Sequence, residues 1–177
     1  MDVREILDYR ASPTFGSLRV RQYNFTIEGL GITFQNQLQR ACFFDNGTLR
    51  YWAVRIVANT DMTIGDVVAL DQAAPDRVIR CPTAGNLRQM PCGVSVETNF
   101  SGRFVFVAVS GIALVRPEAA ITAAAGNLAY TSVTVAGRVQ QSAAVPAGVP
   151  DHNSEVGHFV TTGAGAGIAT PCLLHFN

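Results

Sequence analysis

Residues 63–70 read TIGDVVAL, a turn with a Gly-Asp pair that leads into an apolar strand, and residues 124–130 return to this pattern as AAGNLAY. Gly-Asp and Gly-Asn pairs suit turns in which the backbone needs a positive φ, which glycine adopts without steric cost. A loop, a second strand and a glycine-containing strand follow each copy. These later strands are RVIR at 77–80 with CGVSV at 92–96, and GRVQ at 137–140 with VGHFV at 156–160. The pattern indicates an internal repeat, with two copies of one β unit. A chain rich in Gly, Ala and Val can also produce such a similarity by chance.

Further strands are expected between and before these units. Trp52, Val54 and Ile56 alternate with their neighbours in the period of two that is typical of a half-buried strand, which places Trp52 on the inward face. Residues 103–109, RFVFVAV, are apolar on both faces, as in a central strand of a barrel or sandwich. The best candidate for a helix after residue 49 is the short, alanine-rich segment 117–125. We therefore predict an all-β fold, a compact β-barrel or sandwich.

The first forty-odd residues differ from the rest and predict an extended N-terminal arm, with residues 1–45 as the arm and 46–177 as the β-barrel domain. The apolar positions within residues 1–10 favour a short amphipathic helix. Residues 18–27 read as a strand that could add to the sheet edge of a neighbouring protein or of an adjacent copy. The residues expected to contact the partner are Leu18, Val20, Gln22, Tyr23, Phe25 and Ile27.

Composition limits the classes of partner. Thirteen basic residues balance thirteen acidic ones, so nothing predicts nucleic-acid binding. No apolar run approaches the ~20 residues that span a membrane, and the first ten residues lack the apolar region of a signal peptide. Synthesis in a cytoplasm is therefore expected. Only 15% of the residues are charged, against roughly 25% in an ordinary soluble domain, which favours a surface that meets other protein surfaces.

Four cysteines are present, without the paired spacing of a zinc site. We expect Cys42, Cys81, Cys92 and Cys172 to be buried and reduced. A disulfide between Cys81 and Cys92, which flank a loop containing Pro and Gly, is a less favoured alternative.

Five segments carry a resemblance to a known family: IGDVV at 64–68, CGV at 92–94, GIALV at 111–115, AGNL at 125–128 and VGH at 156–158. Over residues 58–177 the chain resembles the tailed-phage capsid decoration, or cement, proteins, in which such segments recur in this order. The resemblance implies a β-tulip or barrel-like decoration domain and trimers on three-fold or quasi-three-fold positions of the capsid. It also implies the major capsid protein as partner and stabilisation of the expanded head.

The densest polar cluster is DHNSEVGH at 151–158. Asp151, His152, Glu155 and His158 carry groups that ligate zinc or manganese. On a regular strand, however, Glu155 and His158 would point to opposite faces. The favoured interpretation is therefore a polar entry to a hairpin, with no metal and no cofactor.

Three other patterns were weighed as chemical sites. Cys172 and His175 suggest a nucleophile pair, but on a strand they too face opposite sides. Residues 163–167, GAGAG, lack the Lys and the following helix of a phosphate-binding loop and favour a flexible hairpin tip. Acidic residues recur every five positions without the ligand order of a calcium loop, so turn formation explains them: Asp61, Asp66, Asp71 and Asp76. No enzyme is predicted.

The sequence therefore favours a structural virion protein on the outer capsid surface. The alternative from another class is a virion surface module, such as a head fibre, that binds host glycans through Trp52, Tyr51 and Tyr130. A third hypothesis is a virion-associated hydrolase that uses the cluster at 151–158.

Overall fold

The structure is a computed structural model that describes residues 5–10, 19–23, 41–74, 76–85, 90–142 and 154–176. Every regular element in these ranges is a strand, which confirms the all-β prediction. The strands are β1 (Glu5–Arg10), β2 (Arg19–Tyr23), β3 (Ala41–Asp45), β4 (Arg50–Ala58), β5 (Val67–Leu70), β6 (Arg77–Arg80), β7 (Pro91–Ser95), β8 (Phe104–Val115), β9 (Leu128–Thr131), β10 (Val139–Ser142), β11 (Glu155–Phe159) and β12 (Thr170–Leu174). None of the described elements is a helix long and apolar enough to cross a membrane.

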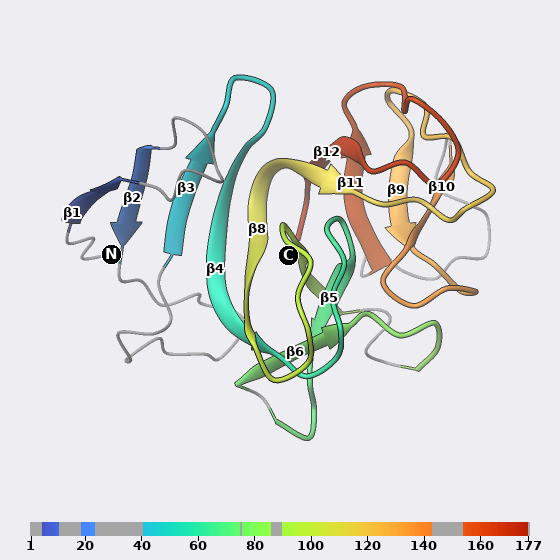
Figure 1. Ribbon diagram of the computed structural model, residues 1–177. Coiled ribbons are helices and arrows are strands. Elements are labelled where there is room, and N and C mark those ends of the chain that lie inside the picture. Colours follow the sequence, from blue (N-terminus) through green and yellow to red (C-terminus); the bar gives the residue numbers. More distant parts are fainter. Residues whose placement is uncertain are drawn as a thin grey trace.

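Five strands close into a barrel in the order β4-β6-β5-β7-β8, with β8 returning to β4 (Figure 1). The closing pair is antiparallel and extends from Arg50 opposite Ile112 to Val57 opposite Phe104. The β4–β6 pair is parallel, and the other pairs of the barrel are antiparallel. Closure satisfies the backbone groups that the edges of an open five-stranded sheet would leave unpaired.

The long strand β8 joins the barrel to the rest of the sheet. Its first part pairs with β4, and its last five residues pair with β12, from which the order continues β11-β9-β10. At the junction, Gly111 has a φ of 94°, and a Cβ there would lie 2.1 Å from the carbonyl oxygen of Arg50. Only glycine fits at this position, where Figure 1 shows β8 curving away from the barrel.

The two units predicted from the sequence are both present and have the same pairing. In the first unit β5 lies between β6 and β7, and in the second β9 lies between β10 and β11. The turns before β5 and β9 place Gly65 and Gly126 at φ values of 85° and 81°. The third strand of each unit contains one extra residue next to a glycine, at Cys92-Gly93 and at Val156-Gly157.

Two hydrophobic clusters form the core, and single strands contribute to both. On β5, Val67 and Ala69 pack in the larger cluster, whereas Val68 packs in the smaller one. β4 likewise places Tyr51 in the larger cluster and Ile56 in the smaller one. This follows from the alternation of strand side chains between two faces, each covered by other strands.

The predicted inward face of β4 is buried at Val54 and Ile56 but only half-buried at Trp52, which lies beside Phe43. On the opposite face Tyr51 is buried and stacks on Phe44, with ring centroids 4.7 Å apart. The bulge in the β4–β8 ladder places its extra residue on β8, so β4 keeps its alternation, and both of its faces are covered over part of their length.

Neither predicted helix is observed in the described residues. Residues 5–10 form β1, which pairs with β2, so hydrogen bonding between strands replaces the helix expected there. Within 117–125, Pro117 forms an isolated bridge with Val139, and the Ile121 amide donates to the Glu118 carbonyl in a turn. Short apolar runs do not distinguish helix from strand without their tertiary partners.

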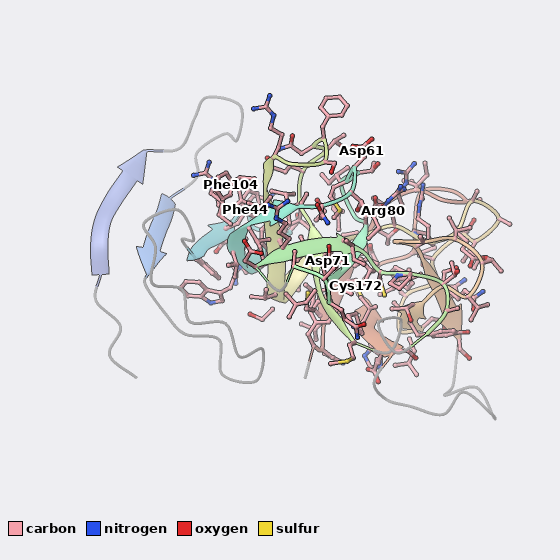
Figure 2. All side chains as sticks on the ribbon, turned by 90° about the horizontal axis from the view of Figure 1, so that it is seen from below. Phe44, Asp61, Asp71, Arg80, Phe104 and Cys172 are labelled. Atoms are coloured by element: carbon pink, nitrogen blue, oxygen red, sulfur yellow. The ribbon has the colours of Figure 1, made fainter. Side chains whose placement is uncertain are left out.

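The N-terminal strands extend the sheet to one side of the barrel, in the order β1-β2-β3-β4 (Figures 1 and 2). β3, which falls within the predicted arm, pairs with β4 along its whole length, from Ala41 opposite Val54 to Asp45 opposite Arg50. β2 is paired on both sides, so β1 is the outer strand at this end of the described sheet.

Candidate functional site

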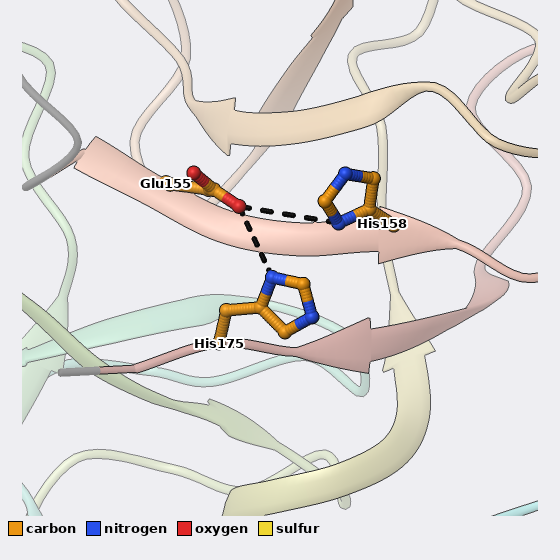
Figure 3. A group of neighbouring side chains, drawn as sticks. All are labelled: Glu155, His158 and His175. Carbon is orange, nitrogen blue, oxygen red and sulfur yellow. Dashed lines mark hydrogen bonds and ion pairs between the residues drawn. The ribbon is translucent and has the colours of Figure 1, made fainter.

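Three side chains that can ligate a metal meet near the open end of the β11–β12 hairpin, away from its loop. They are Glu155 and His158 on β11 and His175, which directly follows β12 (Figure 3). Of the residues described, these alone bring three His, Cys, Asp or Glu side chains close enough to hold one ion, with their ligand atoms within 4.8 Å of one another.

The expectation that Glu155 and His158 point to opposite faces was wrong. Glu155 pairs with Tyr130 and Gly157 with Ala129, so Val156 is an extra residue in β11. The bulge places Glu155 and His158 on the same face although they are three positions apart. The side chain of Val156 points into the core, where it is fully buried.

Gly157 makes this bulge possible. Its φ is 152°, and a Cβ would lie 1.8 Å from the carbonyl oxygen of Leu173 on the neighbouring strand. The close approach of β11 to β12 also allows the His175 amide to donate a hydrogen bond of 2.9 Å to the Val156 carbonyl. This bond fixes the backbone of His175 next to the bulge.

The side chains interact through the carboxylate. Glu155 Oε1 lies 3.1 Å from His175 Nδ1 and 3.9 Å from His158 Nδ1, and the two imidazole centroids are 4.8 Å apart. The exposed fractions are 22% for Glu155, 42% for His158 and 38% for His175. The group is therefore open to solvent on one side and anchored to two strands on the other. Asp151 and His152, the other predicted ligands, lie outside the described residues.

Cys172 and His175 do not form a nucleophile pair in the structure, in agreement with the expectation that they face opposite sides. Cys172 is buried in the larger core cluster, and burial, reinforced by the negative charge of Glu155, raises the pKa of its thiol to about 12. His175 is exposed and hydrogen-bonds Glu155 instead. A neutral buried thiol is a poor nucleophile. Cys81 and Cys92 are likewise buried, and neither forms a disulfide.

The glycine-rich segment 163–167 is not arranged to hold phosphate. The amide of Gly163 donates to the Ala123 carbonyl at 2.9 Å, and the amide of Gly167 donates to the Ile121 carbonyl at 2.8 Å. These two donors, which an anion would need, are already used. The segment forms the loop of the β11–β12 hairpin, as expected, and its backbone is hydrogen-bonded to Ile121 and Ala123.

Three of the four regularly spaced aspartates have separate local roles. Asp61 and Asp71 accept hydrogen bonds from the amides of Ser101 and Ala73, respectively. The Ala73 amide and the Asn59 side chain lower the pKa of Asp71. Asp66 is buried and accepts a bond of 2.9 Å from the Thr63 amide, and burial raises its pKa. Figure 2 shows Asp61 and Asp71 at different places on the barrel.

The predicted partner-binding residues are only partly described. Val20, Gln22 and Tyr23 lie in β2, where Gln22 and Tyr23 pair with Cys42 and Ala41 of β3. Leu18, Phe25 and Ile27 lie outside the described residues. The edge that faces outward belongs to β1.

The aromatic residues weighed for glycan binding are not grouped on an open face. Tyr51 is buried, and Trp52 and Tyr130 are half-buried. The Tyr130 hydroxyl lies 3.4 Å from the Gln141 carbonyl oxygen, to which it donates.

No protein-family model matches this chain, and no curated protein matches its sequence. Any statement about function must therefore come from the residues and their arrangement.

Sequence reasoning missed His175 as a partner of Glu155 and His158, because their proximity depends on strand pairing. One signal was nevertheless present. A glycine within a strand often marks a bulge, and Gly157 occupies the place that Gly93 occupies in the first unit.

Proposed function

We propose that this protein decorates the outer surface of a tailed-phage capsid and stabilises the expanded head. In this proposal the protein is a homotrimer at three-fold and quasi-three-fold positions, the major capsid protein is its partner, and its role is structural, with no catalysis. It would be made in the cytoplasm of a bacterial host and reside in the virion.

The observation that carries the proposal is a β-barrel with few charges and several exposed apolar side chains. Large apolar side chains remain accessible in turns and at strand ends, with Phe100 75% exposed: Ile64, Met90, Phe100, Val133, Val135, Val160, Ile168 and Leu173. Burial of such side chains in an assembly stabilises the assembly by about 25 cal/mol per Å² of apolar surface. Only 15% of the residues are charged, so few charges would lose hydration on docking.

The sheet that continues beyond the barrel supports the same proposal. β1, β2 and β3 extend the barrel sheet to one side, and β1 is the outer strand of the described sheet, the kind of element to which another chain can add a strand. On a capsid, hundreds of copies act together, so modest individual contacts give strong total attachment.

The direct test is to purify heads from a phage that encodes the protein and to analyse them by mass spectrometry. We expect the protein in stoichiometric amounts, and purified protein should sediment with expanded heads that lack it. Absence from the heads would end the proposal. Specific glycan binding by the isolated protein, with no binding to heads, would favour the head-fibre alternative.

A further inference from the structure

We propose that Glu155, His158 and His175 form a binding site for one divalent ion of the zinc class. This site is additional to the proposed capsid role and does not depend on it. Two imidazoles and one carboxylate suit Zn²⁺, Co²⁺, Ni²⁺ or Cu²⁺, whereas Ca²⁺ and Mg²⁺ prefer oxygen ligands.

The distances are close to what such an ion requires. Ligands at ~2.0–2.1 Å from tetrahedral zinc are about 3.3–3.4 Å from each other. Oε1 of Glu155 lies 3.1 Å from Nδ1 of His175, which fits, and 3.9 Å from Nδ1 of His158. A small rotation of the exposed His158 side chain would bring the third ligand into place.

The backbone beneath the site is held in place, which limits the cost of ordering the ligands. Glu155 and His158 lie on β11 and His175 directly follows its partner strand β12, and the bulge at Val156 and Gly157 puts Glu155 and His158 on one face. The hydrogen bond from the His175 amide to the Val156 carbonyl connects the third ligand to that bulge. Sites built on paired strands hold their ligands more accurately than sites on loops.

The internal repeat provides a comparison within the same chain. Pro91 and Val94 pair with β5 in the first unit just as Glu155 and His158 pair with β9 in the second. Pro91 and Val94 are apolar and buried. The same bulge therefore serves packing in one unit and presents ligand side chains in the other, so the fold of the unit does not itself require these polar residues.

Three protein ligands leave at least one coordination position open toward solvent, because His158 and His175 are exposed by 42% and 38%. A water molecule would fill that position in the isolated chain. The competing explanation is that the three side chains only hydrogen-bond one another.

The test uses the full chain without a polyhistidine tag, treated with chelator and then titrated with Co²⁺ and Zn²⁺. We expect one ion per chain, d–d absorption bands typical of Co²⁺ with nitrogen and oxygen ligands, displacement by Zn²⁺, and a rise in melting temperature. Mg²⁺ and Ca²⁺ should have no such effect. Changes outside the first ligand shell already weaken metal sites ~10–100-fold, so H158A, H175A and E155Q should each weaken binding by at least about 100-fold.

The matched control is D76N, which neutralises the exposed carboxylate of Asp76 just before β6; this variant should bind as the wild type does. Melting curves in chelator show whether each variant is folded, and E155Q keeps an acceptor oxygen in case an alanine variant unfolds. Wild-type protein that binds no ion overturns the site, as does binding that survives all three ligand variants or is lost in D76N. Head binding is measured separately, so either proposal can fail alone.

Discussion

At the scale of single residues, Asp66 shows how burial and hydrogen bonding oppose each other. Its carboxylate is only 2% exposed. The Thr63 amide donates to it, and Arg138 Nε lies 3.9 Å away. Burial raises the pKa of Asp66 despite these partners, so loss of hydration outweighs their attraction.

We predict that D66A lowers the free energy of unfolding by about 1–3 kcal/mol, because the partly buried Thr63 amide loses its acceptor. D66N keeps an acceptor oxygen and should cost much less. Urea unfolding at neutral pH measures both, with D76A as an exposed control within roughly 0.5 kcal/mol of wild type. Equal losses in D66A and D66N would contradict this account.

The same residue predicts a pH dependence. A carboxyl whose pKa is higher in the folded state favours folding when protonated, and this contribution is lost as pH rises through the folded pKa. The stability of wild type relative to D66N should therefore decrease from acidic to neutral pH. A relative stability that rises over that range would show that the arginines dominate.

Cysteine reactivity is a second prediction at this scale. Cys81, Cys92 and Cys172 are buried, and burial raises the pKa of Cys92 and of Cys172 to about 12. At pH 8 roughly one thiol in 10⁴ of these two is ionised. In a C42S background we expect almost no reaction of the native protein with a thiol reagent, and three reactive thiols after denaturation. Rapid labelling of the native chain would contradict the buried placement.

At the scale of elements, the β11 bulge connects packing to the candidate site. The bulge depends on Gly157, since a Cβ would meet backbone atoms of Leu173 and Leu174. Backbone atoms in a paired strand cannot move aside as a flexible side chain can.

We therefore expect G157A to lower the free energy of unfolding by more than about 3 kcal/mol. The control is G126A, where φ is 81° but a Cβ would have open space, so only the backbone strain of ~1–2 kcal/mol applies. Chemical denaturation compares the two variants. Similar losses would show that the approach of β11 to β12 is less strict than the structure indicates.

At the scale of the whole molecule, β1 and β2 lie outside the closed barrel, whereas β3 pairs with β4 and its Phe44 packs against the larger core cluster. β1 and β2 extend the sheet without closing it, while the barrel closes independently through β4 and β8. Folding and attachment should thus be separable.

Deletion of residues 1–40 should leave a folded trimer, with a melting temperature near that of the full chain, that no longer binds heads tightly. Light scattering gives the oligomeric state, and sedimentation with expanded heads measures binding. If the truncated protein decorates heads normally, the N-terminal strands are dispensable for attachment; if it unfolds, they belong to the stable core.

By itself, the sequence determined the strand content, the repeat and the turns, because period-two alternation and Gly-Asp or Gly-Asn pairs are local signals. The similar strand pairing around β5 and β9 agrees with the sequence similarity between residues 63–70 and 124–130. Local signals also misled, since residues 5–10 and 117–125 suggested helices and form none. Short segments take their final conformation from their partners in the sheet.

Only the tertiary structure decided the barrel closure, the burial of Tyr51 instead of Trp52, and the meeting of Glu155, His158 and His175. Each depends on which strands pair and in what register, and in β11 the extra residue Val156 puts Glu155 and His158 on one face. Such a residue changes the pairing between strands that are distant in the sequence. The alternation of side chains within a single strand does not reveal this pairing.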